Sequence, residues 1–211
     1  DWSSDVCSSD LAENSIVVAS GANMLLNEQD VDKVVEEMCE GDILLMQLEI
    51  PIQTVEYAAR KAFEKGVKVV LNPAPARSLP KELLRYLFMI TPNRIEAEML
   101  TGIKIMNDAD AERVAKEISA MGVQNIIVTL GSKGCLVREG DTSYCVDAFK
   151  VEPVDTTAAG DTFNGALCVG LAEGMNLRQA AVMASKASSV AVTRMGAQSS
   201  IPHRKELDLN E

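Results

Sequence analysis

Short apolar runs alternate along the chain with longer segments of helical periodicity. Runs with the length and the Val, Ile and Leu content of buried parallel strands cover 16–19, 43–48, 67–71 and 126–129. Apolar residues with helical spacing cover 28–39, 54–64, 95–100, 109–121, 161–173 and 177–194. A hairpin is expected from 135–137 to 144–146, with its turn over 138–144. This alternation predicts a doubly wound α/β/α sandwich with a mostly parallel central sheet, which binds ligands at the carboxyl ends of its strands.

One stretch combines small residues with an acid where a helix is expected to begin. It reads VDTTAAGDTFNGAL over 154–167. Ala158, Ala159 and Gly160 allow the backbone to approach a ligand closely, and free amides at a helix start attract phosphate oxygens. Asp161 beside them could take a proton from a hydroxyl that attacks phosphorus, as phosphoryl transfer to an alcohol requires. The alternative is that Asp161 only caps the helix.

A second candidate is the pair Asn93 and Glu96 in TPNRIEAE. Pro92 suits a helix start, and Glu96 follows one turn later, so both side chains could face the same strand end. Magnesium binds few protein carboxylates and keeps several waters, so one Glu suffices for it. A capped helix with solvent-facing acids explains the same pattern.

Five segments together resemble the ribokinase family of carbohydrate kinases, also called the PfkB family. They are NPAPAR at 72–77, TPNRIEAEMLTG at 91–102, TLGSKG at 129–134, DTTAAGDTFNGAL at 155–167 and AVTRMGAQSSIP at 191–202, in the family's order. The resemblance extends from about Ser15 to the end of the chain. It implies a ribokinase-like fold and transfer of the terminal phosphate of ATP to the primary hydroxyl of D-ribose. A kinase for fructose, deoxyribose or a nucleoside, or a fragment that binds nucleotide without turnover, stays open.

The resemblance also implies roles for individual residues. Asp161 is the expected base and touches the sugar, the amides of Ala158, Ala159 and Gly160 form an anion hole, and Glu49 hydrogen-bonds a sugar hydroxyl. The residues expected on the nucleotide side are Asn93, Thr129, Gly131, Ser132, Lys133, Gly134, Gly160 and Ser185. Glu96 is expected to organise Mg²⁺ through water. A potassium ion is expected at the backbone of Asp155, Thr157, Ala191, Arg194, Gly196 and Ser200, for which an ordinary loop is the alternative.

The beginning of the chain departs from the family pattern. Residues 1–11 read DWSSDVCSSDL, a serine-rich acidic stretch without apolar periodicity, and neither a glycine-rich sugar-binding motif nor lid strands are found. We therefore expect residues 1–14 to be a disordered junction segment and 15–211 to be a partial domain that lacks its N-terminal part and lid. Because the family dimerises through the lid, a homodimer is in doubt for this chain, and so is full sugar binding.

Composition agrees with a cytoplasmic enzyme that acts on a small molecule. The chain has 211 residues, 47% of them apolar, which suits one domain with a sizeable core. Its net charge of −11 opposes nonspecific attraction to nucleic acid, and no apolar run reaches the length of a membrane span. The five scattered cysteines indicate reduced thiols. His203 is the only histidine, which argues against a catalytic triad or a histidine-rich zinc site.

Overall fold

The computed structural model describes the backbone of residues 5–8, 14–17 and 21–207, and the side chains of 21–207. The helices of this part are α1 (Glu28–Glu37), α2 (Ile52–Glu64), α3 (Lys81–Leu84), α4 (Arg94–Thr101), α5 (Asp108–Ala120), α6 (Ala159–Ala172) and α7 (Leu177–Ala191). The strands are β1 (Asp5–Ser8), β2 (Asn14–Val17), β3 (Ile43–Met46), β4 (Lys68–Leu71), β5 (Met89–Ile90), β6 (Asn125–Thr129), β7 (Cys135–Glu139) and β8 (Thr142–Val146). Short 3₁₀ turns are η1 (Gly21–Leu25), η2 (Gly131–Lys133), η3 (Gln198–Ser200) and η4 (Arg204–Glu206). Within the described residues, no helix combines the length and the apolarity that crossing a bilayer takes.

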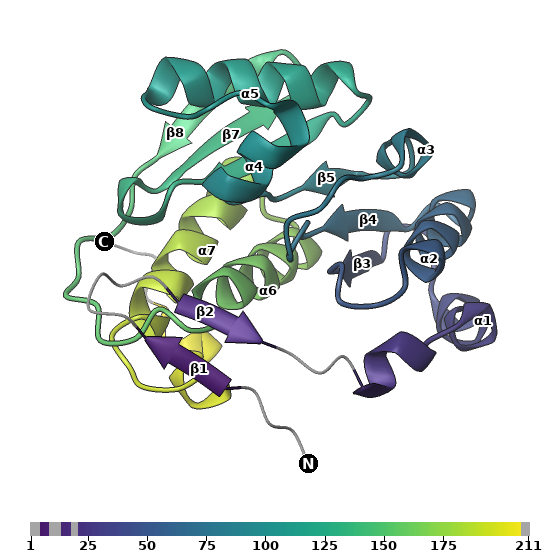
Figure 1. Ribbon diagram of the computed structural model, residues 1–211, viewed down its shortest axis with the longest axis horizontal. Coiled ribbons are helices and arrows are strands. Elements are labelled where there is room, and N and C mark those ends of the chain that lie inside the picture. Colours follow the sequence, from purple (N-terminus) through teal and green to yellow (C-terminus); the bar gives the residue numbers. More distant parts are fainter. Residues whose placement is uncertain (1–4, 9–13, 18–20, 208–211) are drawn as a thin grey trace.

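The main sheet has six strands in the order β3-β4-β5-β6-β7-β8. The first four run parallel, and β7 and β8 are antiparallel additions at one edge. Right-handed crossovers between sequential parallel strands place their helices on one face of a sheet. The helices α1 to α5 accordingly pack on one face, and α6 and α7 cover the other (Figure 1). The predicted three-layer α/β/α sandwich with a mostly parallel sheet is confirmed.

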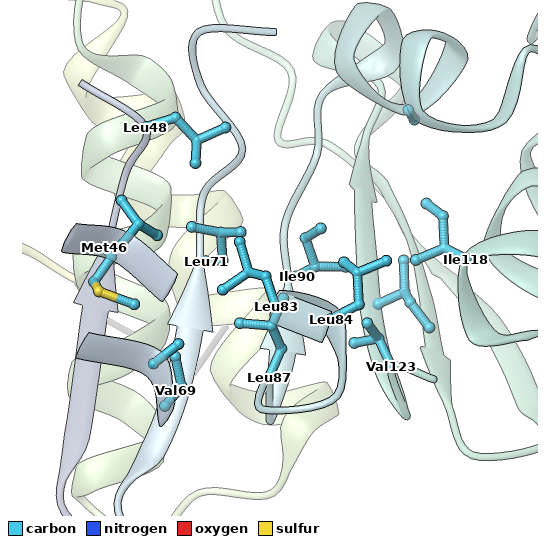
Figure 2. Packing of buried hydrophobic residues seen from close by; sticks show 14 of the residues in the cluster. Met46, Leu48, Val69, Leu71, Leu83, Leu84, Leu87, Ile90, Ile118 and Val123 are labelled. Atoms are coloured by element: carbon cyan, nitrogen blue, oxygen red, sulfur yellow. The ribbon is translucent and has the colours of Figure 1, made fainter. Parts of the chain in front are cut away.

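The larger core lies between the parallel strands and the helices that connect them. Figure 2 shows Met46 of β3, Leu71 of β4 and Ile90 of β5 packed with Leu83 of α3 and Ile118 of α5. Alternate residues of the same strands enter the second core on the opposite face, beneath α6 and α7. Because both faces of β4 and β5 are buried, their sequences read as continuous apolar runs rather than as an alternation of apolar and polar residues.

The two helices of the opposite layer pack closely because small residues line their contact. A Cβ placed on Gly170 of α6 would lie 3.2 Å from the Cα of Ala180 and 3.1 Å from the terminal methyl of Met183, both on α7. Ala180, Ala181 and Ala184 of α7 are completely buried. This close packing joins the last turns of α6 to the first half of α7.

The N-terminal strands differ from the prediction. The run 16–19 was expected to be a parallel strand of the main sheet, but β2 pairs antiparallel with β1 in a separate two-stranded sheet. An apolar run specifies a strand without specifying its partner, which explains the error. Strand β1 (Asp5–Ser8) falls within the segment 1–14, which stays a predicted junction segment. Residues 1–4, 9–13 and 18–20 lie outside the described residues.

The hairpin is tighter than predicted. The turn expected over 138–144 shrinks to Gly140 and Asp141, since β7 extends to Glu139 and β8 starts at Thr142. Gly140 has a φ of 56°, and a positive φ at the first position suits a two-residue hairpin connection. Arg138, expected in the turn, is instead a buried strand residue whose guanidinium donates to Ser143 Oγ.

Candidate functional site

The beginning of α6 presents Asp161 to solvent. Ala158 is the residue before the helix and adopts the left-handed conformation, with φ 58° and ψ 14°. Asp161 is the third residue of the helix, and its side chain makes no capping bond. Its Oδ1 instead accepts a hydrogen bond of 2.7 Å from Nε2 of Gln47, one residue beyond β3. The alternative in which Asp161 serves as the helix cap is therefore wrong.

Several amides at this helix start are available to a ligand. Among the described residues, the N–H groups of Ala158, Gly160 and Asp161 have no hydrogen-bond acceptor, whereas that of Ala159 donates to the Thr156 carbonyl at 3.3 Å. The set of free donors thus differs by one from the expected Ala158, Ala159 and Gly160. Such a group of free N–H donors at the positive end of a helix dipole suits an anion.

A cavity of about 480 Å³ opens beside these amides. Residues expected on the nucleotide side share its lining, namely Thr129, Gly131, Ser132, Gly134, Gly160 and Ser185. Ala159 lines it too, together with apolar side chains such as Phe149, Val151 and Phe163. Lys133 and Asn93 are outside this lining. The structure therefore gathers residues from β6, η2, α6 and α7 around one space large enough for a small-molecule ligand.

Asn93 and Glu96 form a capping box at the start of α4. Asn93 Oδ1 accepts from the Glu96 N–H at 2.9 Å, and the Glu96 carboxylate accepts from the backbone N–H and the Nδ2 of Asn93, each at 2.8 Å. Glu96 is buried, and burial raises the pKa of its carboxyl, while the backbone hydrogen bond from Asn93 acts against the rise. A parallel bridge places Asn93 beside Thr129 at the carboxyl ends of β5 and β6. The local bonds are those of the capped-helix alternative, but Glu96 is buried rather than solvent-facing as that alternative expected.

Two loops that were expected to surround a cation lie together. Asp155 joins them, because its carboxylate accepts from the N–H of Thr157 and from the N–H of Gly196, both at 2.9 Å. Hydrogen bonds from Thr157, and then from Gly196, lower the pKa of Asp155. The carbonyl of Ala191 accepts from the Arg194 N–H.

The side chains of the other two residues expected near the cation have partners of their own. The Arg194 guanidinium pairs with Glu206 at 2.6 Å, and the buried Ser200 hydroxyl donates to the Ala197 carbonyl at 2.7 Å. A guanidinium has no acceptor, so any contribution of Arg194 to a cation site would come from its backbone.

Glu49 lies apart from the nucleotide side. It lines a second cavity, of about 370 Å³, between α1 and β3, and it is exposed. Gln47 lines the same cavity and donates to Asp161, so this one side chain connects the second cavity to the start of α6. Gln47 was not among the residues predicted from the sequence. In an extended chain alternate residues share a face, so its position two residues before Glu49 is the sequence signal that points to it.

Known proteins resemble this chain in sequence and in fold. The model of the pfkB family of carbohydrate kinases matches residues 6–204. Ribokinase of Haemophilus influenzae is 46% identical over 195 residues. A crystal structure of ribokinase from Thermotoga maritima is 37% identical, with a TM-score of 0.84. A structure of Arabidopsis thaliana ribokinase complexed with ribose and ATP is 29% identical, with a TM-score of 0.87.

The shares of length covered differ between this chain and its relatives. The match takes in 92% of this chain and 64% of the Haemophilus protein, 97% and 67% for the Thermotoga structure, and 98% and 67% for the Arabidopsis structure. This chain thus spans about two thirds of the length of the proteins it resembles. With a family model matched over nearly all of its residues, the chain belongs to the pfkB family of carbohydrate kinases.

Proposed function

We propose that this protein is an ATP-dependent sugar kinase that phosphorylates the primary hydroxyl of D-ribose. The observation that carries the proposal is the placement of Asp161. Its carboxylate is exposed in the first turn of α6, beside free amides and a cavity lined by the expected nucleotide-binding residues. Ribokinases among the relatives, one of them complexed with ribose and ATP, support ribose as the acceptor.

The proposed reaction needs a base and a site for the transferred group. Asp161 takes the proton from the ribose hydroxyl as that oxygen forms a bond to the terminal phosphorus of ATP. The bond between this phosphorus and the bridging oxygen of ADP breaks, and ADP leaves. The free N–H groups at the start of α6 stabilise the negative charge on the phosphoryl oxygens during transfer. The hydrogen bond from Gln47 orients the Asp161 carboxylate before it takes the proton.

Two cations belong to the proposal. Mg²⁺ would neutralise phosphate charge, and Glu96 fits a contact through water, since each carboxylate oxygen that accepts from Asn93 keeps a second lone pair. For K⁺, the carbonyls of Asp155, Thr157, Gly196 and Ser200 accept no hydrogen bond among the described residues, which leaves them available as ligands. K⁺ would add positive charge beside the anion-binding turn. Lys133, outside the cavity lining, would add charge near phosphate only after moving.

Glu49 is the proposed sugar contact, and the cellular setting is part of the proposal. Glu49 lines the second cavity with Gln47, so a sugar held there would lie between Glu49 and Asp161. We propose a cytoplasmic location, which the free thiols of Cys39, Cys135, Cys145 and Cys168 support. We propose a monomer for this chain, which light scattering on a sizing column would test.

Asp161→Asn tests the function. ADP release from ATP is followed in a coupled assay with ribose, 2-deoxyribose, fructose and a nucleoside as acceptors, and ATP affinity is measured by calorimetry. We expect turnover with ribose to be abolished and ATP affinity to be nearly unchanged, because the base acts only on the acceptor.

Asp108→Asn is the matched control, since Asp108 is an exposed acid in the first turn of another helix, α5. The control should keep turnover. Normal turnover in the Asp161 variant would refute the role of the base, and preference for another acceptor would correct the substrate. ATP binding without turnover in the unchanged protein would favour the nucleotide-binding fragment.

A further inference from the structure

Two peptide groups at the start of α6 are held through their carbonyl oxygens. The hydroxyl of Ser188, on α7, donates to the carbonyl of Ala159 at 3.0 Å. The Nδ2 of Asn164 donates to the carbonyl of Gly160 at 2.9 Å. The carbonyl of each residue shares a planar trans peptide with the N–H of the next residue, and the two groups point in opposite directions. Together with the helical backbone of α6, these bonds therefore hold the N–H groups of Gly160 and Asp161 in their directions.

The side chain of Asn164 is itself held by the sheet. Thr91, directly after β5, donates through its hydroxyl to Asn164 Oδ1 at 2.6 Å. Thr91 and Asn164 are only 2% and 4% exposed. A buried polar pair is costly unless its hydrogen bonds are made, so this pair has one favourable arrangement. It couples the peptide group of Gly160 to the carboxyl end of a central strand.

The segment before the helix is anchored as well. The Val192 carbonyl, at the end of α7, accepts from the N–H groups of Val154 and Asp155 at 2.7 and 3.1 Å. The Asp155 carboxylate then accepts from Thr157 and Gly196. With both sides of the turn fixed, Ser188 and Asn164 add a side-chain restraint to the Ala159–Gly160 and Gly160–Asp161 peptide groups, which already lie in the first turn of α6.

We propose that Ser188 and Asn164 are positioning residues of the anion-binding turn, which keep the N–H groups of Gly160 and Asp161 aimed at the phosphoryl group during transfer. The inference rests on the proposed function, because that function brings the phosphoryl group to this turn. Donors that are oriented in advance contribute most where charge develops, in the transition state. Loss of either side chain should therefore weaken binding of a transition-state mimic more than binding of ADP.

The test compares Ser188→Ala with Ser189→Ala. Both serines line the same cavity, but the Ser189 hydroxyl donates to the Lys186 carbonyl within its own helix. Calorimetry measures the affinity of each protein for ADP with Mg²⁺, alone and with fluoroaluminate, a mimic of the phosphoryl group in transfer. We expect Ser188→Ala to lose about tenfold in affinity for the fluoroaluminate complex, less than the loss of a whole oxyanion donor, with ADP affinity unchanged. Ser189→Ala and the hydroxyl-retaining Ser188→Thr should match the unchanged protein.

A spectroscopic measurement tests the orientation directly. In protein labelled with ¹⁵N-glycine, the Gly160 amide resonance should shift when the fluoroaluminate complex binds, and this shift should shrink in Ser188→Ala. Asn164→Ala should lose affinity in the same way as Ser188→Ala, and Thr91→Val should show a smaller loss, since it only releases the Asn164 side chain.

The outcomes separate the two proposals. If the unchanged protein binds ADP no more tightly with fluoroaluminate than without it, the proposed function fails. If it does bind more tightly, but Ser188→Ala and Asn164→Ala bind equally well, the positioning roles are overturned while the proposed function stands. Equal losses in Ser188→Ala and Ser188→Thr would likewise overturn the role of the hydroxyl.

Discussion

Gly134 is the position where a single methyl group should damage the nucleotide side most. It follows η2 with φ 89° and ψ −133°, a conformation that side-chain-bearing residues avoid. A Cβ there would lie 2.7 Å from the Ala148 nitrogen and 2.8 Å from the Asp147 carbonyl carbon, and closer still to the carbonyl oxygen of Val146. All three atoms belong to the backbone, so no change of rotamer relieves the contact.

The cost of Gly134→Ala has two parts. The left-handed φ costs about 1–2 kcal/mol, and displacing the backbone after β8 adds about 1–3 kcal/mol, as overpacking generally does. A combined loss of about 3 kcal/mol lowers the melting temperature of a domain of this size by roughly 6–12 °C. Gly131→Ala is the matched control, because Gly131 has φ 60° in the same loop and a Cβ there meets nothing within 4 Å. Gly131→Ala should lose only the free energy that a positive φ costs, about 1 kcal/mol, which lowers the melting temperature by roughly 2–4 °C.

Thermal unfolding followed by circular dichroism, with urea unfolding as a second measure, compares the two alanine variants. The steric reasoning requires Gly134→Ala to melt well below Gly131→Ala. Melting temperatures that agree within about 2 °C, less than the shift expected from 1 kcal/mol, would refute it. The same result would show that the backbone after β8 can be displaced at little cost in free energy, and that this wall of the cavity is more deformable than its contacts indicate.

Two further predictions concern charged groups of the site. Burial raises the pKa of Glu96 above its ordinary value of 4.5, so the folded state holds this proton more tightly than the unfolded state does. The contribution of this proton to stability is present below pH 4.5 and is lost as the pH rises through the raised pKa. The free energy of unfolding, measured in urea, should therefore fall over that pH range relative to that of Glu96→Gln. A constant difference between the two proteins would contradict this. Gln47→Ala removes the hydrogen bond to Asp161, and kcat should fall about tenfold with an unchanged KM for ATP, as expected for a misoriented base. An unaltered kcat would show that Asp161 keeps its orientation without Gln47.

The parts of the fold that could be predicted are those with strong local patterns. The β4 and β6 strands are apolar runs buried on both faces, β3 is an apolar run at the edge of the sheet, and the six longer helices carry helical periodicity. In contrast, β5 has only two residues, Met89 and Ile90, and α3 is a single turn. Neither is long enough to show a period. β5 is a strand because β4 and β6 pair with it on either side, which is a tertiary effect.

The candidate site divides in the same way. Asp161 and the small residues before it are neighbours in the sequence, so their shared position at a helix start could be predicted. The contact between Gln47 and Asp161 joins residues 114 positions apart, and the buried pair of Thr91 and Asn164 joins residues 73 apart. The left-handed conformation at Ala158, which starts α6, also lacks a local signal, since alanine rarely adopts it. These features depend on how the carboxyl ends of the strands converge on α6.

Ser188 and Ser189 show why the residues that support the anion-binding turn could not be predicted from the sequence. They are adjacent and identical in type, and both line the cavity. Their hydroxyls nevertheless bond in different directions, one to the Ala159 carbonyl on α6 and the other to the Lys186 carbonyl on α7 itself. Successive helical residues are rotated by about 100°, so the helix phase alone decides which serine faces α6. That phase is set by the packing of α7, in which Ala180 lies against Gly170 and Ala184 is completely buried, and Gly170 lies near the opposite end of α6 from Asp161. The orientation of the anion-binding turn is therefore a product of helix packing, and changes in that packing should reach the turn through Ser188.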